Sequence, residues 1–217
     1  MEAEEARAAM VAQLRAGGVV RSPAVAAALA AIPRHRFIDG GDLEWAYADH
    51  AVTVKTTDDG VPISSVSQPT MVATMLELCL LEPGHRVLEI GTGSGYNAAL
   101  LAAIVGPGPV VSVELDADLA AGAAARLDRL GLEGVEVVTG DGTAGHAPGA
   151  PYDRVVVTAG AAAIAEPWDD QLRLGGRLVV PIVDGDGIGV VRCLVKATSG
   201  FEELARVPCG FLTMRTP

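Results

Sequence analysis

The segment SQPTMVATMLELCLLEPGHRVLEIGTGSGYNAALLA, which runs from Ser67 to Ala102, decides the fold. Its apolar character is interrupted at Gly91-Thr92-Gly93-Ser94-Gly95, where three glycines stand at alternate positions. Glycine costs backbone entropy wherever it sits, so this run indicates a backbone that turns sharply or approaches a ligand closely. A short strand pattern precedes the glycines and a helical pattern follows them. That arrangement places a ligand at a helix N-terminus, beside the carboxyl end of the strand.

Around this segment, strand-like and helix-like patterns alternate. Runs rich in Val, Ile and Leu predict strands at 86–90, 110–114, 135–139, 154–158 and 177–181. Helical patterns at 96–105 and 118–130 separate the first three, which favours a parallel sheet covered on both faces. Two later runs, 189–196 and 204–212, are joined by Ser199-Gly200 without a helix and predict an antiparallel pair at the sheet's edge.

The N-terminal part is less regular. Apolar spacing predicts a helix over 3–16, and Ser22-Pro23, a cap followed by proline, starts a second helix that reaches about residue 31. Regularity is weak over 33–62, where Thr57-Asp58-Asp59-Gly60 is typical of an exposed turn. Pro69 can start a further helix that runs to about residue 80.

Composition limits the partners that the chain can have. Of its 217 residues, 50% are hydrophobic, which suits one substantial core, and 16 Lys and Arg against 27 Asp and Glu give a formal charge of −11. Such a chain repels phosphate backbones, so we expect no nucleic acid partner. The apolar runs are broken before they could span a bilayer, the acidic start is unlike a signal peptide, and three scattered cysteines suit a reduced compartment. We therefore expect a cytoplasmic protein without membrane contact, and its oligomeric state stays open.

Two acidic positions indicate the class of ligand. Glu114 closes the second strand, where a carboxylate can accept both hydroxyls of a ribose, and Asp141 closes the third, where it can take an adenine amino group. A nicotinamide fingerprint would need glycine at 96, where the chain has Tyr96, and the loop lacks a P-loop lysine. These observations favour S-adenosylmethionine over a dinucleotide. The predicted fold is therefore an α/β, Rossmann-like class I methyltransferase with a mostly parallel sheet.

The same segment carries a family resemblance. Together with IPRHRF (32–37), AYAD (46–49), GDG (140–142), PYDRVVVTA (151–159) and QLRLGGRLVVP (171–181), it resembles the protein-L-isoaspartate (D-aspartate) O-methyltransferases. The glycine loop alone would indicate only a methyltransferase, whereas Ser-Gln-Pro with Ala-Tyr-x-Asp makes the match specific. The resemblance, which covers about 32–213, implies methyl transfer from S-adenosylmethionine to the carboxylate of an altered aspartyl residue. S-adenosylhomocysteine is the cofactor product, and the ester closes to a succinimide that can hydrolyse to normal aspartate.

The resemblance also implies the site residues. Ser67 matches the family's serine that faces the acceptor carboxylate, so we expect it to be the catalytic residue and to position the acceptor by a hydrogen bond. A carboxylate is already ionised at pH 7 and needs no general base, which leaves alignment as the main task. We expect no metal, and Tyr47 and Asp49 are candidates for shaping the substrate groove. The predicted cofactor-binding residues are Ser64, Ser65, Val66, Ser67, Glu89, Gly91, Thr92, Gly93, Ser94, Gly95, Asn97, Glu114, Leu115, Asp141, Gly142 and Thr158.

Some segments depart from the family pattern and leave the acceptor open. They are AGAAAIAEP after the fourth predicted strand, the C-terminal PCGFLTMRTP (208–217) and the stretch before the serine. The partner is a peptide or protein that bears isoaspartate or aspartate. It is either damaged protein in general or a dedicated ribosomally made peptide whose ordinary aspartate is converted to a succinimide. A protein that only binds or scaffolds is a further alternative. We expect one domain over 1–217, with 1–82 as a helical, substrate-facing segment and 83–217 as the cofactor-binding sheet.

Overall fold

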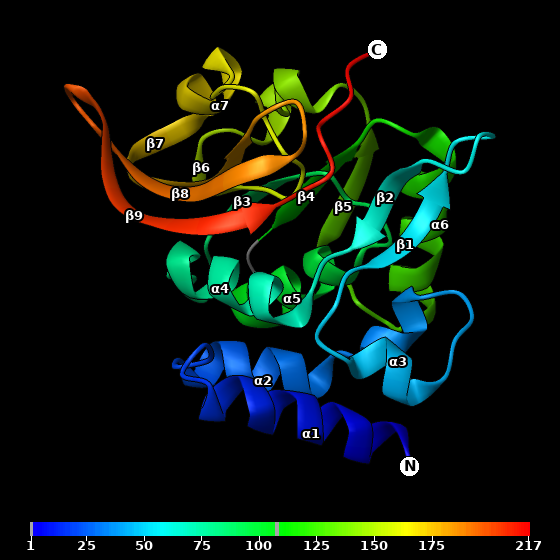
Figure 1. The fold of residues 1–217 in the computed structure, drawn as a ribbon. Coiled ribbons are helices and arrows are strands. Elements are labelled where there is room, and N and C mark those ends of the chain that lie inside the picture. Colours follow the sequence, from blue (N-terminus) through cyan, green and yellow to red (C-terminus); the bar gives the residue numbers. More distant parts are fainter. Residues whose placement is uncertain (1, 107–108) are drawn as a thin grey trace.

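The computed structural model describes residues 2–106 and 109–217, and its centre is a seven-stranded sheet with strand order β5-β4-β3-β6-β7-β8-β9 (Figure 1). Five strands run parallel to one another: β3 (Val87–Ile90), β4 (Val110–Glu114), β5 (Val135–Thr139), β6 (Tyr152–Val157) and β7 (Leu172–Val183). The last two pair antiparallel at one edge: β8 (Ile188–Ala197) and β9 (Gly200–Gly210). The predicted α/β sheet with an antiparallel C-terminal edge is confirmed.

The order of the strands places a crevice beside β3. The chain leaves β3 for β4 and β5 on one side and then returns to β6 on the other side of β3. In open parallel sheets, ligands bind outside the carboxyl ends of the strands at such a reversal. The glycine run follows β3 directly, so it lies at this point of the fold.

Helices form layers against the sheet. α4 (Pro69–Cys79) contacts β6, β7 and β8, while α5 (Tyr96–Val105) and α6 (Ala117–Arg129) contact β4 and β5. α1 (Ala3–Ala16) and α2 (Pro23–Ala31) lie beneath α4 and α5, on the side away from the sheet (Figure 1). Along β3, Val87 belongs to the hydrophobic core shared with these helices, whereas Leu88 and Ile90 belong to the core on the other face. Because successive side chains of a strand point to opposite faces, the sheet contributes residues to two cores, one on each side.

The expectation of weak regularity over 33–62 is wrong. That stretch contains a 3-10 turn η1 (Arg34–Phe37), α3 (Leu43–Tyr47) and β1 (Val52–Thr56), and β1 pairs antiparallel with β2 (Pro62–Val66) in a separate hairpin. The predicted turn at 57–60 connects these two strands, and Gly60 takes the positive φ that it needs. The register shifts twice within the five-residue strands, which explains why no sustained alternation is visible in the sequence.

On the second face, short irregular elements cover the sheet. They are η2 (Gly142–Ala144), η3 (Ala147–Gly149) and α7 (Glu166–Gln171), where the sequence patterns predicted no element.

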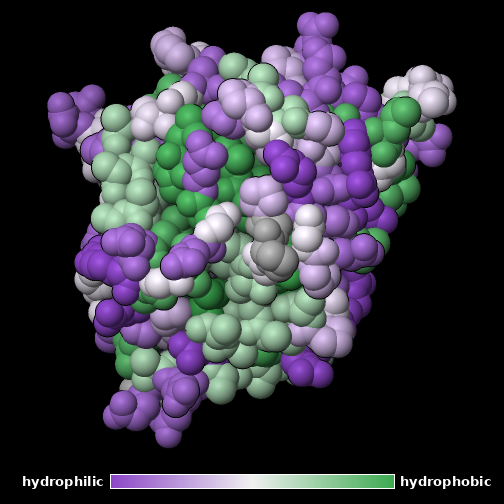
Figure 2. All heavy atoms as spheres, turned by 180° about the vertical axis from the view of Figure 1, so that it is seen from behind, coloured by the Kyte–Doolittle hydropathy of each residue, from purple (hydrophilic) through white to green (hydrophobic). Residues whose placement is uncertain are grey.

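Within the described ranges, no helix is long and apolar enough to cross a membrane. Seen from behind, the surface carries hydrophobic residues over its middle with hydrophilic residues around them (Figure 2).

Candidate active site

A cavity of about 680 Å³ opens at the carboxyl ends of β3, β4 and β6. Four stretches of chain contribute most of its lining: 62–75, 90–97, 113–115 and 208–215. Its volume lies in the range of sites for nucleoside-sized ligands. The cavity therefore brings together residues that are up to 164 positions apart in the sequence, from Ala51 to Arg215.

The glycine loop forms one wall because its backbone comes very close to neighbouring groups. Gly91 has a φ of +97°, and a Cβ atom there would lie 2.8 Å from the Thr158 hydroxyl. That hydroxyl donates to the carbonyl oxygen of Gly91 at 2.6 Å and so fixes the loop to the end of β6. Gly93 also has a positive φ, and a Cβ atom there would lie 3.3 Å from Ser64 Oγ. The loop therefore offers bare backbone to the cavity, as the glycine spacing predicts.

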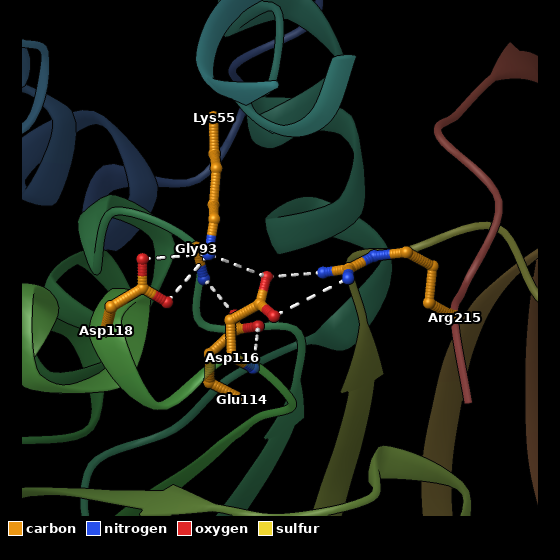
Figure 3. Close-up of polar contacts among 6 residues, drawn as sticks. All are labelled: Lys55, Gly93, Glu114, Asp116, Asp118 and Arg215. Atoms are coloured by element: carbon orange, nitrogen blue, oxygen red, sulfur yellow. Dashed lines mark hydrogen bonds and ion pairs between the residues drawn. The ribbon is translucent and has the colours of Figure 1, made fainter. Parts of the chain in front are cut away.

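Glu114 is held in place at the end of β4. Its side chain lines the cavity although only 7% of the residue is exposed. Oε2 accepts the backbone N–H of Gly93 at 2.8 Å, and Oε1 accepts that of Asp116 at 3.2 Å (Figure 3). Each carboxylate oxygen has a further lone pair. The carboxylate is thus oriented by the glycine loop and can still accept hydrogen bonds from a ligand.

Glu89 lies behind the loop and not in the cavity wall. It is fully buried, and its oxygens accept hydrogen bonds from Asn97 Nδ2 at 2.8 Å and Ser112 Oγ at 2.5 Å. Burial raises the pKa of Glu89 to about 7, and the negative charge of Glu114 adds to the effect, although the two hydrogen bonds oppose it. Asn97 does line the cavity. Glu89 therefore supports the wall through Asn97.

Asp141 uses its carboxylate locally. It caps η2, because its two oxygens accept the backbone N–H of Thr143 at 2.9 Å and the Thr143 hydroxyl at 2.8 Å. The cavity lining includes the adjacent Gly142 but not Asp141 or Gly95. The predicted contact between Asp141 and an adenine amino group stays a prediction.

The remaining predicted residues meet in the cavity. They come from the end of β2 and the residues after it, from the glycine loop, and from the ends of β4 and β6. Those that line it are Ser64, Ser65, Val66, Ser67, Thr92, Ser94, Leu115 and Thr158. Tyr47 and Asp49 are not part of the lining; Tyr47 is buried and its hydroxyl is hydrogen-bonded to His35 Nδ1 at 2.8 Å.

The C-terminal stretch 208–215 is a wall of the cavity, and none of its residues is among the predicted cofactor-binding residues. Arg215 lines the cavity and reaches Asp116 at 2.5 Å, while Lys55 of β1 reaches Asp116 at 3.4 Å and Asp118 at 2.7 Å (Figure 3). Hydrogen bonding to Arg215 is the main cause that holds the pKa of Asp116 below its usual range. No local pattern could have revealed these contacts, because they join residues far apart in the sequence.

A second group of lining residues that sequence reasoning missed is apolar. Met71 and Met75 lie one turn apart on α4, and Tyr96 starts α5. Apolar residues at helical spacing are typical of a core, and nothing in the spacing separates a core residue from one at a pocket wall. Among the described residues, no group of three or more His, Cys, Asp or Glu side chains could hold a metal ion.

Comparisons with known proteins identify the family. The family model described as "Protein-L-isoaspartate(D-aspartate) O-methyltransferase (PCMT)" matches residues 5–213. "Protein-L-isoaspartate O-methyltransferase 2" of Pelobacter propionicus is 48% identical over 82% of this chain and 76% of its own. The protein-L-isoaspartate O-methyltransferase of Ignicoccus hospitalis is 36% identical over 97% of this chain and 98% of its own.

Solved structures agree with the fold. A protein-L-isoaspartate O-methyltransferase structure superposes with a TM-score of 0.88 and 34% identity, over 95% of this chain and 65% of that longer chain. A Plasmodium falciparum structure, solved in complex with S-adenosyl-L-homocysteine, gives a TM-score of 0.80 at 20% identity over 95% of this chain and 97% of its own, and it bears on the fold alone. From the family model and the relatives together, the chain belongs to the protein-L-isoaspartate (D-aspartate) O-methyltransferase family and is an enzyme that methylates isoaspartyl carboxylates with S-adenosylmethionine.

Proposed function

We propose that this chain binds S-adenosylmethionine in the cavity beside β3 and methylates isoaspartyl carboxylates of damaged proteins that enter next to Ser67. The single observation that carries this proposal is that Glu114, the glycine loop and Ser67 line one cavity. The first two are the elements that the sequence predicts for an adenosine-containing ligand. For Ser67, the family resemblance implies a role beside the acceptor.

The residues present fit this cofactor. The absence of Cβ atoms at Gly91 and Gly93 leaves a cradle of backbone that an amino acid carboxylate and ammonium could approach. Glu114 is already oriented by two backbone donors and keeps lone pairs for the two hydroxyls of a ribose. Leu115, Met71 and Met75 supply apolar lining for the flat faces of a base. These features support the assignment of the predicted residues that line the cavity.

The chain itself has little chemistry to perform. When bound, S-adenosylmethionine supplies an activated methyl group. The acceptor carboxylate is ionised at neutral pH, so no residue has to remove a proton from it. What the protein adds is the in-line placement of that carboxylate, which can account for a large part of a barrier. In this reaction the Ser67 hydroxyl donates a hydrogen bond that orients the acceptor oxygen.

The acceptor side of the cavity supports proteins or peptides as substrates. The stretches 186–188 and 208–215 line it together with Ser67, and Ile188 is 63% exposed there. A peptide could lie along such an edge through backbone hydrogen bonds, which suits clients of many sequences. Residues 1–82 supply Ser67 and its supports, whereas 83–217 supply the cradle, and we assign the two parts these roles within one domain. The relatives are all described as protein-L-isoaspartate O-methyltransferases, and they lend no support to the dedicated-peptide alternative.

The test is methanol release after methylation of short unstructured peptides. Several peptides that carry isoaspartate and their matched aspartyl counterparts are incubated with equal amounts of enzyme and S-adenosylmethionine. We expect turnover of the isoaspartyl peptides and none of the aspartyl ones. Failure to turn over any isoaspartyl peptide, by protein that binds the cofactor in calorimetry, would overturn the proposal.

A further inference from the structure

Arg34 is a buried charge that holds the backbone just before Ser67. The residue is fully buried, and its guanidinium donates to three carbonyl oxygens: Ala46 at 2.9 Å, His50 at 3.3 Å and Val66 at 3.4 Å. The carbonyl of Val66 belongs to the peptide bond that Val66 forms with Ser67. Arg34 therefore fixes one end of the segment that carries the serine.

The same guanidinium reaches the wall of the cavity. Its central carbon lies 5.3 Å from the ring centroid of Tyr96, a residue of the cavity lining. Within the described part of the chain, Nη1 of Arg34 has no hydrogen-bond partner. A buried guanidinium with an unpaired nitrogen is a costly way to stabilise a core, since an apolar side chain of similar size often does better. The placement of Arg34 is thus better explained by what it orients.

Asp49 holds the backbone just after Ser67. It is an exposed residue whose Oδ1 accepts the backbone N–H of Thr70 at 2.8 Å. Its Oδ2 accepts the Thr70 hydroxyl at 2.7 Å and Gln68 Nε2 at 2.9 Å. Burial tends to raise the pKa of Asp49, but these donors and the charge of Arg34 outweigh it and hold that pKa below its usual value. The carboxylate is therefore charged at neutral pH and holds both Gln68 and Thr70.

Ser67 lies between these two anchors. Arg34 holds the carbonyl that precedes it, and Asp49 holds Gln68 and Thr70, which follow it. We propose that Arg34 and Asp49 are positioning residues of the methyl transfer, which act through Ser67; this rests on the role proposed for that serine. A displacement of about 1 Å in a group that aligns reactants can cost about a hundredfold in rate. Two fixed points next to Ser67 prevent that displacement.

The first experiment is a double-mutant cycle between Asp49 and Ser67, because the exposed Asp49 can be replaced without opening the core. Asp49→Ala should lower kcat on an isoaspartyl peptide about tenfold, while the cofactor dissociation constant stays within about twofold. In the Ser67→Ala background, Asp49→Ala should lower kcat less than about twofold further, since both changes remove the same alignment. Additive effects of the two replacements would overturn the proposal.

Asp42→Ala is the matched control. Asp42 is an exposed aspartate of the same segment that caps α3 by accepting the N–H of Trp45 at 2.8 Å, so its replacement removes a local hydrogen bond and no hydrogen-bond partner of Arg34 or Asp49. Its kcat should remain that of the parent enzyme. An equal loss in Asp42→Ala and Asp49→Ala would show a general structural effect and refute the positioning role.

Arg34 is tested by its conservative and its apolar replacement. Arg34→Lys should retain part of kcat, because the ammonium can still reach the Val66 carbonyl, and Arg34→Met should lose at least as much as Asp49→Ala. If Arg34→Met does not fold, the cycle at Asp49 decides alone. Failure of the proposed function would appear as parent enzyme without isoaspartyl turnover. Failure of this inference would appear as an active parent, an impaired Ser67→Ala variant and an unimpaired Asp49→Ala variant.

Discussion

Replacing Glu114 by alanine should weaken the binding of S-adenosylhomocysteine by between about thirtyfold and a thousandfold. Glu114 is a buried residue of the cavity lining, only 7% exposed, and two backbone donors already orient its carboxylate. A hydrogen bond to a charged group contributes about 1.5–3 kcal/mol, and two to a ribose would be partly offset by water in the variant. A net loss of about 2–4 kcal/mol corresponds to the stated range.

Calorimetric titration of the folded variants measures this loss. Glu114→Gln keeps one acceptor oxygen, so its affinity should lie between those of the parent and the alanine variant. Asp128→Asn is the control for long-range charge, because Asp128 is exposed on α6 and lies outside the cavity lining. Unchanged affinity in Glu114→Ala would refute the ribose contact, and an equal loss in Asp128→Asn would show that net charge is responsible.

Three further predictions concern Ser67, Glu89 and Arg215. Ser67→Ala should slow methyl transfer while cofactor affinity stays within a few-fold; a parallel loss of both in calorimetry and turnover would make the serine a cofactor clamp. Because the folded pKa of Glu89, about 7, lies above its ordinary 4.5, its contribution to stability is present below about pH 4.5 and lost as the pH rises through 7. In urea unfolding, the free energy of unfolding of Glu89→Gln relative to that of the parent should therefore be higher at pH 8 than at pH 5, by up to about 3 kcal/mol. The same difference between variant and parent at both pH values would contradict the raised pKa. Arg215→Gln removes the ion pair with Asp116, an exposed interaction of about 0.2–1 kcal/mol. Product release in stopped-flow should then be up to about fivefold faster and less sensitive to salt, which an unchanged rate would disprove.

The sheet was predictable because each of its strands has a local sequence pattern typical of a strand. Val87–Ile90 and Val110–Glu114 are short runs of buried, mostly apolar residues, bounded by turn residues and separated by a helical pattern. The hairpin of β1 and β2 could not be predicted in the same way, because two register shifts break the alternation of buried residues. The strand predicted at 177–181 is longer in the structure, where β7 runs from Leu172 to Val183. It continues through Gly175, although a glycine with positive φ is typical of a break in a strand.

The wall of the cavity that the glycine loop and Glu114 form was predictable for the same reason, and the rest of the cavity was not. Gly91, Gly93 and Glu114 each stand at the end of a strand, where the topology of a parallel sheet determines their position. Asp141 shows the limit of this reasoning, because a carboxylate beside a free backbone N–H caps its own turn in competition with a ligand. Arg215 shows another limit, since its contact with Asp116 depends on tertiary folding alone.

The two sides of the cavity differ in how freely their sequence can change, and this bears on how such enzymes diversify. On the glycine side, a side chain at Gly91 would collide with the Thr158 hydroxyl, and the positive φ of Gly91 would add strain. Substitutions of Gly91 are therefore strongly disfavoured. On the opposite side, residues 208–215 belong to the end of the edge strand β9 and to the C-terminal segment after it, where Arg215 forms an ion pair with Asp116. Within this stretch, Pro208, Gly210 and Thr213 are exposed, whereas Cys209, Phe211 and Met214 pack against the hydrophobic cores. Selection for new clients can therefore act on the exposed positions, while the packed ones are constrained. A library randomised at Pro208, Gly210 and Thr213 would explore client preference while the packed side chains of the stretch stay unchanged.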